Sequence, residues 1–112
     1  MNLVGQILKE TIDKFNKRVS EDPKLAAEIG TMTRKVQVQV EDGDWYYFVL
    51  SNGRASDPVK GSIENPDIRV TATSETLKKL FTGELRAMKA LATKRVRVQA
   101  SLEDMLRLRK LF

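Results

Sequence analysis

Apolar residues recur every three or four positions in the first part of the chain. This set consists of Leu3, Val4, Ile7, Leu8, Ile12, Phe15 and Val19. At about 100° per residue these side chains fall on one half of a helix, so the pattern predicts an amphipathic helix that packs on a sheet. Asp22 and Pro23 then start a second helix, because Asp22 can cap it and Pro23 suits its first position. Gly30 ends that second helix.

A different pattern begins at residue 34, where apolar and polar residues alternate strictly up to residue 41. The three valines of this segment share one face, which predicts a half-buried strand with one polar face. Asp42 and Gly43 follow it and predict a type I′ turn, since both central positions of such a turn need positive φ. The turn leads into a second strand over residues 45–50.

A second turn signal, Asn52 followed by Gly53, sends the chain into a third strand over residues 54–60. Pro58 has no backbone N–H to donate, so this third strand is expected at an edge of the sheet. The first three strands are therefore predicted to form an antiparallel meander.

The second strand is apolar on both of its faces. One face carries Trp45, Tyr47 and Val49, and the other carries Tyr46, Phe48 and Leu50. One of these faces must pack against the helices. The opposite face needs another cover, for which a loop, a partner subunit and a ligand are the candidates.

The last third of the chain predicts two more strands separated by a mainly helical segment. The fourth strand covers residues 67–73 and the fifth covers residues 94–100. Between them Ser74 can cap a helix that Gly83 ends, and residues 84–93 supply further helical turns. This connection permits a crossover, which would be right-handed if the two strands are parallel. The sheet is therefore expected to be mixed.

The closing helix begins after Ser101, which can cap it, and is apolar over more than half of its circumference. Its apolar residues are Leu102, Met105, Leu106, Leu108, Leu111 and Phe112. This is more apolar surface than one buried stripe requires. Deeper burial in the core, a dimer contact and one wall of a lipid pocket are the interpretations that spacing alone leaves open.

Composition excludes several kinds of chemistry. The 112 residues, 41% of them hydrophobic, fit one globular domain over residues 1–112. The chain has no Cys and no His, which excludes disulfides, thiolate nucleophiles, zinc sites of the Cys/His type and imidazole acid–base catalysis. Glu41, Asp42 and Asp44 are close in sequence but lack the spacing of a calcium loop. We therefore expect no enzyme, no metal site and no cofactor.

A net charge of +5 favours acidic partners. The alternative function is a basic nucleic-acid-binding module that uses the outward sheet face. The basic residues that would form its stripe are Lys35, Arg69, Arg95 and Arg97. The same face of the first, fourth and fifth strands lacks aromatic residues that would stack on bases, which argues against this module.

The amino-terminal helix has charged residues, such as Lys9 and Asp13, within its apolar pattern, so it does not look like a secretory signal. No apolar run approaches the roughly 18 residues that a membrane span needs. The protein is therefore expected to be cytoplasmic.

The last third of the chain is similar to the corresponding part of a known protein family, both in the order of its elements and in a group of its residues. The matching residues are Thr76, Leu77, Leu80, Thr82, Gly83, Glu84, Met88, Lys89 and Ala90, followed by residues 94–100 and by Leu111 and Phe112. This order and spacing resemble the sterol carrier protein 2 (SCP2) family of lipid-binding domains. The resemblance implies an α+β fold, with a five-stranded mixed β-sheet, helices packed mainly on one face, and an apolar cavity between the sheet and the C-terminal helices.

The resemblance also implies non-catalytic binding and transfer or storage of a fatty acid, a fatty acyl-CoA, a phospholipid or a sterol-like molecule. The expected partner is a lipid or other long apolar molecule, with transient contact to a membrane surface, and the protein is expected to be a monomer or a homodimer. The ligand-binding residues that the resemblance implies are Phe81, Leu85, Met88, Leu91, Met105, Leu108 and Phe112, with Trp45 and Phe48 added from the second strand. Met88 and Met105 suit this role because methionine adapts to flexible alkyl chains.

Overall fold

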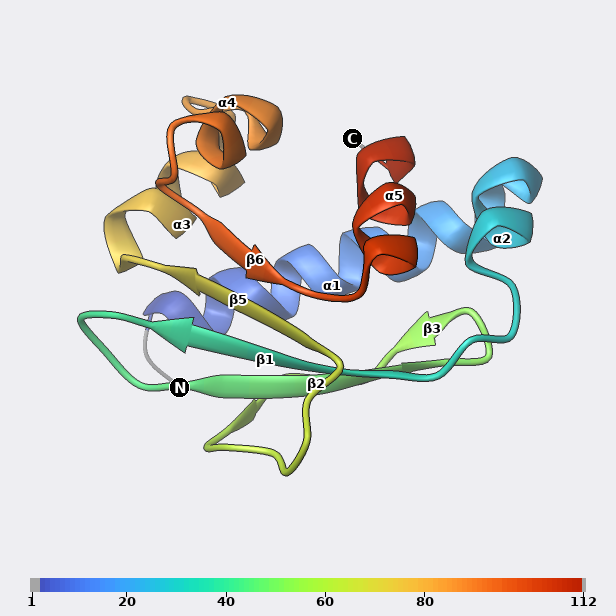
Figure 1. Ribbon diagram of the computed structural model, residues 1–112, viewed down its shortest axis with the longest axis horizontal. Coiled ribbons are helices and arrows are strands. Elements are labelled where there is room, and N and C mark those ends of the chain that lie inside the picture. The colour runs from blue at the N-terminus through green and yellow to red at the C-terminus, as the bar shows by residue number, and fades with distance from the viewer. Residues whose placement is uncertain (1–2, 112) are drawn as a thin grey trace.

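A single mixed sheet carries all of the helices on one of its faces (Figure 1). The computed structural model describes residues 3–111, and their side chains as far as residue 109. The helices are α1 (Leu3–Glu21), α2 (Pro23–Ile29), α3 (Ser74–Thr82), α4 (Ala87–Ala92) and α5 (Leu102–Leu111). The strands are β1 (Arg34–Val40), β2 (Tyr46–Ser51), β3 (Arg54–Ala55), β4 (Val59–Lys60), β5 (Ile68–Ala72) and β6 (Arg97–Gln99). The expected α+β class, with helices on one face, is confirmed.

The strand order is β3-β2-β1-β5-β6, and β4 also pairs with β2. The strands β1 and β5 are parallel, with Val36 opposite Ile68, whereas all the other pairs are antiparallel. The sheet is therefore mixed, as expected. The parallel neighbour of β5 is β1 and not β6, however, because α3 and α4 return the chain to the end of the sheet at which β5 stopped.

The predicted third strand is broken into two short strands, so the sheet has six strands where five were expected. Leu50 pairs with Ala55 in β3, and Tyr46 pairs with Lys60 in β4. Pro58 lies between these two strands, where its missing N–H interrupts the pairing. The predicted antiparallel meander of the first three strands is confirmed.

The two predicted hairpin turns have different outcomes. Asn52 and Gly53 have φ angles of 52° and 73°, as a type I′ turn requires. The prediction of the same turn at Asp42 and Gly43 is wrong, since neither residue has a positive φ. The Asp42 carboxylate instead accepts hydrogen bonds from the Ser74 backbone N–H (2.8 Å) and hydroxyl (2.6 Å) at the start of α3.

The N-cap of α3 lies one residue before the predicted one. The N-cap is Thr73 and not Ser74, and the Thr73 hydroxyl accepts a hydrogen bond from the Thr76 N–H. The other predicted caps are confirmed. Asp22 accepts hydrogen bonds from two backbone N–H groups of α2, and Gly83 ends α3 with φ of 82°.

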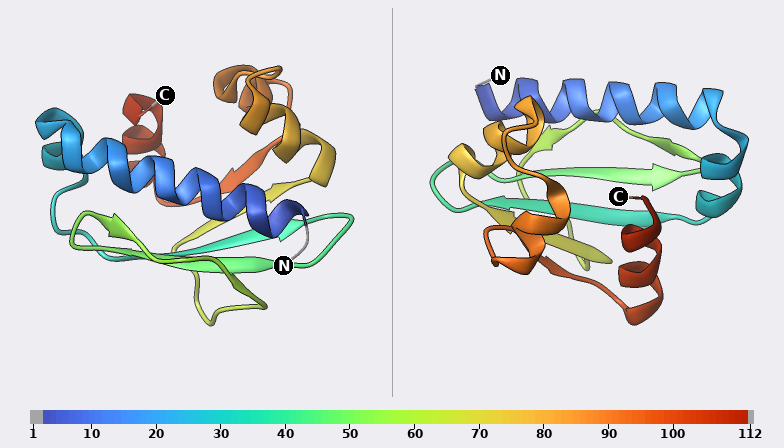
Figure 2. Two further views of the ribbon diagram at one scale, coloured as in Figure 1. Left: turned by 180° about the vertical axis from the view of Figure 1, so that it is seen from behind. Right: turned by 90° about the horizontal axis from the view of Figure 1, so that it is seen from above.

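The amphipathic helix α1 lies along the sheet and supplies much of the core (Figure 2). Its Val4 and Leu8 pack against Val38, Val40 and Tyr46. Towards its other end, a second cluster consists of Ile12, Val19, Leu25, Ile29, Leu50 and Ala55. A third cluster, away from α1, consists of Ala72, Leu85, Ala90 and Val96. Within residues 3–111, no helix is both long and apolar enough to cross a membrane.

The loop after β4 covers part of the sheet face that lies away from the helices. It is therefore the cover, or part of the cover, that the second apolar face of β2 was expected to need. Gln37 of β1 is only 2% exposed although it lies on this far side. Its amide nitrogen donates to the carbonyl oxygens of Tyr46 (2.8 Å) and Gly61 (3.0 Å), and its amide oxygen accepts from the Ile63 N–H (2.9 Å). Gly61 also lies beside the Tyr47 ring. The Gln37 side chain therefore supplies two of the hydrogen bonds that hold the loop after β4 against the sheet.

Replacing Gln37 with leucine is expected to lower the free energy of unfolding by about 2–3 kcal/mol, because one buried and two half-buried hydrogen bonds to backbone groups are lost. The matched control is Gln39→Leu, on the same strand and face. Gln39 is half-buried and accepts one bond, from the Thr71 hydroxyl, so its replacement should cost less than about 1 kcal/mol. Urea unfolding of both variants measures the difference, and equal losses would show that the loop does not depend on Gln37.

Candidate functional site

The closing helix α5 stands apart from α3 and α4, and its main neighbour is α2 (Figures 1 and 2). It begins as predicted, with the Ser101 hydroxyl accepting the Asp104 N–H at 3.1 Å. The strand β6 leads into it from the edge of the sheet. This arrangement leaves α5 with far less apolar packing than a helix buried in the core.

An ion pair fastens α5 to the start of β1. The Arg34 Nε donates to Asp104 Oδ2 at 2.8 Å, and Arg107 Nη1 lies 3.3 Å from Asp104 Oδ1. Asp104 is 4% exposed, so this is a buried carboxylate with two cationic partners. The hydrogen bond from Arg34 lowers the pKa of Asp104, and the same bond raises the pKa of Arg34. Sequence reasoning missed this contact, because Arg34 and Asp104 lie 70 residues apart and no local pattern relates them.

The side of α5 away from this ion pair is uncovered and carries two leucines beside the exposed Arg109. Leu102 is 77% exposed and Leu106, one turn later, is 50% exposed. Asp104 and Leu108 share the covered side, and Met105 lies between the two sides and is half-buried. The interpretation of α5 as a deeply buried core helix is therefore wrong.

The residues predicted on α4 and just before it divide into buried and exposed positions. Leu85 is buried in the cluster with Ala72, Ala90 and Val96, and Leu91 packs against that cluster. Met88 is 45% exposed on α4. The structure thus brings Leu85 and Leu91 together, whereas Met105 and Leu108 lie on α5 and outside this cluster.

The predicted aromatic residues do not gather at one place. Trp45 lies in the connection before β2 and is 43% exposed. Phe48 is half-buried against the two clusters beneath α1, and Phe81 is half-buried on α3. Phe112 lies outside the described residues. The enclosed cavity between the sheet and the C-terminal helices stays a prediction.

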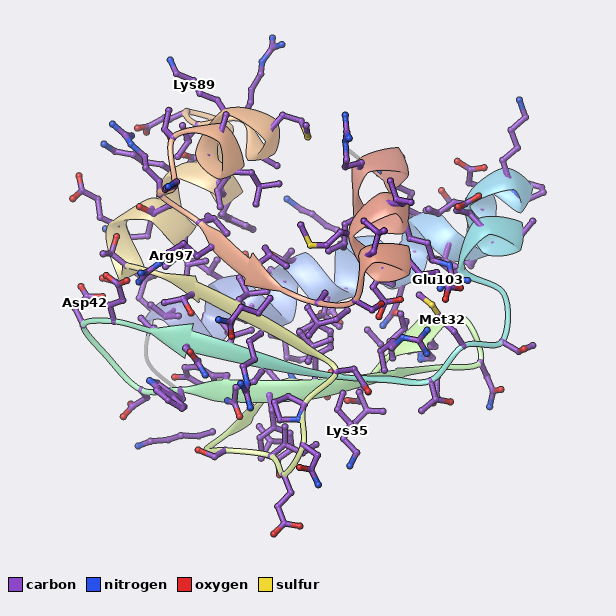
Figure 3. All side chains as sticks on the ribbon, in the orientation of Figure 1. Met32, Lys35, Asp42, Lys89, Arg97 and Glu103 are labelled. Atoms are coloured by element: carbon purple, nitrogen blue, oxygen red, sulfur yellow. The ribbon has the colours of Figure 1, made fainter. Side chains whose placement is uncertain are left out.

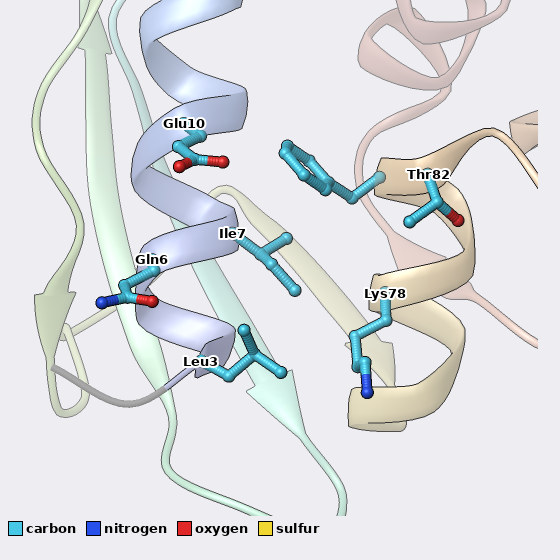
Figure 4. Close-up of a pocket in the computed structure, with 7 residues that line it drawn as sticks. Leu3, Gln6, Ile7, Glu10, Lys78 and Thr82 are labelled. Atoms are coloured by element: carbon cyan, nitrogen blue, oxygen red, sulfur yellow. The ribbon is translucent and has the colours of Figure 1, made fainter.

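A small open pocket of about 250 Å³ lies between α1 and α3 (Figure 4). Its lining residues are Leu3, Gln6, Ile7, Glu10, Lys78, Phe81 and Thr82. The Lys14 ammonium lies 4.6 Å from the centre of the Phe81 ring, a cation–π distance. The helical spacing of Leu3 and Ile7 placed both residues on the apolar face that was expected to pack in the core. Spacing alone does not tell a side chain that lines a pocket from one that is packed in the core.

The acidic residues near the first turn do not converge. Glu41 pairs with Arg97, Asp42 binds Ser74, and Asp44 lies 3.4 Å from Lys60. Within the described part of the chain, no group of three or more acidic side chains could hold a metal ion.

The outward basic row is interrupted. The Lys35 ammonium donates to the Glu64 carbonyl oxygen at 3.3 Å, and Arg97 is paired with Glu41. The loop fastened by Gln37 covers part of the same face. The carboxylate partner of Arg97 and the loop over part of this face both argue against a nucleic-acid interface there.

Comparison with known proteins identifies related sequences and structures. The model of the SCP-2 sterol transfer family matches residues 12–112. No curated protein sequence matches the chain. A sterol carrier protein domain of Helicoverpa armigera is 18% identical with a TM-score of 0.65, and the match covers 99% of this chain and 89% of that one. The palmitated sterol carrier protein 2-like 2 of Aedes aegypti is 16% identical with a TM-score of 0.63, over 99% and 94% of the two chains.

Part of a larger enzyme also shares this fold. The inverting sec-alkylsulfatase of a Pseudomonas species is 19% identical with a TM-score of 0.60, and the match covers 87% of this chain. This chain spans only 13–15% of the sulfatase chains that it matches. At such identities the likeness shows the fold, because one fold serves many functions.

Proposed function

Because the chain belongs to the SCP-2 sterol transfer family, we propose that it binds a lipid or another long apolar molecule and carries it without changing it chemically. The candidate ligands are a fatty acid, a fatty acyl-CoA, a phospholipid and a sterol-like molecule. We propose that residues 1–112 act as one domain in this role. The cytoplasmic location stays a prediction.

The observation that carries the proposal is the way in which α5 is attached. A helix at the end of a small domain normally buries its apolar stripe. Here the fastening contact is the Arg34–Asp104 ion pair, while Leu102 and Leu106 remain 77% and 50% exposed. Met105 and Leu108 on this helix are half-buried and belong to none of the three core clusters, so an apolar ligand can cover them.

The ligand contacts that we propose come from the segments before and after β6. Leu85, Met88 and Leu91 precede β6 in the chain, and Met105 and Leu108 follow it on α5. We keep Phe81, Phe112, Trp45 and Phe48 in the proposed set. Of these, Phe81 also faces the pocket between α1 and α3 (Figure 4).

Burial of the alkyl chain supplies the affinity in this proposal. Each CH₂ group withdrawn from water contributes about 0.8 kcal/mol. A chain of about a dozen carbons therefore retains useful affinity after the loss of its translational and conformational freedom is subtracted. No reactive side chain is required for this mechanism.

Native mass spectrometry of the purified protein tests the proposal. We expect a discrete mass increment from a bound lipid, which disappears after extraction of the same sample with organic solvent. The extracted protein should then take up a fluorescent fatty acid or sterol with saturable binding. A protein that carries no increment and takes up neither probe would contradict the proposed function.

A further inference from the structure

The net charge of the protein comes from one short segment. Residues 85–102 contain five basic residues and no acidic residue, whereas the rest of the chain has 15 of each sign. Four of the five, Arg86, Lys89, Lys94 and Arg95, lie on α4 or beside its ends, and all four are exposed. We call these four residues the basic corner.

Several cations elsewhere in the protein are paired with carboxylates, whereas the four cations of the basic corner are not. Lys9, Arg34, Lys60, Lys79 and Arg107 all form ion pairs. Within the described part of the chain, no carboxylate lies within ion-pair distance of any of the four corner residues. Lys89 points away from the body of the protein (Figure 3). The positive charges of the four corner residues are therefore available to an external anion.

The basic corner is held rigidly. Lys94 has a positive φ of 59°, and the backbone N–H groups of Arg95 and Val96 both donate to the Ala90 carbonyl oxygen. Ala90 is fully buried and Val96 is 8% exposed, so this turn is anchored in the third core cluster. These hydrogen bonds and buried side chains therefore hold in place the segment that carries the four cations.

The helices α4 and α5 also carry exposed apolar side chains. Met88, within the corner, is 45% exposed, and α5 carries the exposed Leu102 and Leu106. The ends of α4 and α5 both project away from the sheet on its helical face (Figures 1 and 2). Cations beside exposed apolar groups match the chemistry of a bilayer surface, where anionic headgroups cover an apolar interior.

From this distribution we propose that the basic corner, together with Met88 and the exposed leucines of α5, docks the protein on an anionic membrane. The choice of a bilayer over another acidic partner rests on the proposed function, because a membrane is the source or destination of a lipid cargo. The docked orientation turns α4 and α5 towards the membrane. The amphipathic helix α1 takes no part, since its apolar face is buried against the sheet.

The test compares sedimentation of the protein with two kinds of vesicle, one of phosphatidylcholine alone and one with about 30% phosphatidylserine. We expect binding only to the anionic vesicles, weakening as salt rises from about 50 to 200 mM. The variant Lys89→Gln/Lys94→Gln/Arg95→Gln should bind about a hundredfold more weakly, since each cation near an anionic surface contributes about fivefold.

The matched control is Lys17→Gln/Lys24→Gln/Arg54→Gln, which removes three exposed cations from other surfaces. We expect this variant to bind the anionic vesicles within about threefold of the wild type. Equal losses in the two triple variants would overturn the proposal, because net charge would then explain the binding. An oligonucleotide that binds the corner more tightly than the vesicles would also overturn it.

Docking and cargo binding are measured separately. Vesicle binding of the wild-type protein does not require a bound lipid, and lipid uptake is measured without vesicles. A protein that docks through the basic corner but takes up no lipid probe would contradict the proposed function alone. A protein that takes up the probe but ignores anionic vesicles would contradict the docking alone.

Discussion

Replacement of Arg34 by alanine is expected to lower the free energy of unfolding by about 3 kcal/mol, because it leaves the buried Asp104 carboxylate without its principal partner. Arg107 remains near Asp104 and limits the loss. The helix α5 should detach first, since this ion pair is its main fastening. Urea unfolding measures the stability, and faster hydrogen exchange of the α5 amides reports the detachment.

Arg54→Ala is the control for this experiment, because Arg54 is an exposed cation on β3. Its removal should change the stability by less than about 0.5 kcal/mol. An unfolding curve of Arg34→Ala that coincides with that of Arg54→Ala would show that the buried pair does not hold α5.

The same pair predicts a pH dependence. The pKa of Asp104 is lowered in the folded protein, chiefly by the hydrogen bond from Arg34, from an ordinary value of 3.8. A lowered pKa means that the contribution to stability is fully present above the ordinary value and is lost as the pH falls below it. The stability difference between the wild type and Arg34→Ala should therefore be constant near neutral pH and shrink below about pH 4.

Replacing Met105 with glutamate is expected to weaken the binding of a fluorescent fatty acid by about a hundredfold, or about 3 kcal/mol. If Met105 contacts the ligand as we propose, the new carboxylate must lose water beside an alkyl chain that cannot hydrogen-bond to it. Met105→Leu conserves volume and apolar character and should bind within about threefold of the wild type. Fluorescence titration measures all of these affinities.

Leu102→Glu is the matched control on the same helix, because it adds the same charge at a position that is 77% exposed. It should leave the affinity for the fatty acid nearly unchanged. Circular dichroism of both glutamate variants confirms that each is folded before the titration. Normal binding by folded Met105→Glu would remove Met105 from the proposed site, and equal losses at the two positions would indicate a general effect of charge on α5.

Local features of the sequence predicted much of the secondary structure. Asp22, Pro23 and Gly83 cap their helices as expected because each cap depends on backbone groups only a few residues away. The alternating valines of β1 all face the core for the same reason, since the side-chain period of a strand is a local property. Ser74 is instructive as an exception, because Asp42, 32 residues earlier, binds it and Thr73 becomes the cap.

The candidate site was less predictable than the fold. Helical spacing identified the excess apolar surface of α5, but it could not decide what covers that surface. The Arg34–Asp104 pair joins residues 70 positions apart and determines which side of α5 is buried. The pocket between α1 and α3 likewise depends on how two distant helices approach each other.

The sequence by itself determined which segments are helices and strands, the family to which the chain belongs, and the concentration of positive charge in residues 85–102. Each of these properties depends on neighbouring residues or on their order. Only the tertiary structure decided that β5 pairs in parallel with β1, that Gln37 fastens a loop over the far face, and that α5 leaves two leucines uncovered. These outcomes depend on contacts between residues far apart in the chain, whose formation is decided by the whole path of the backbone and not by any local pattern.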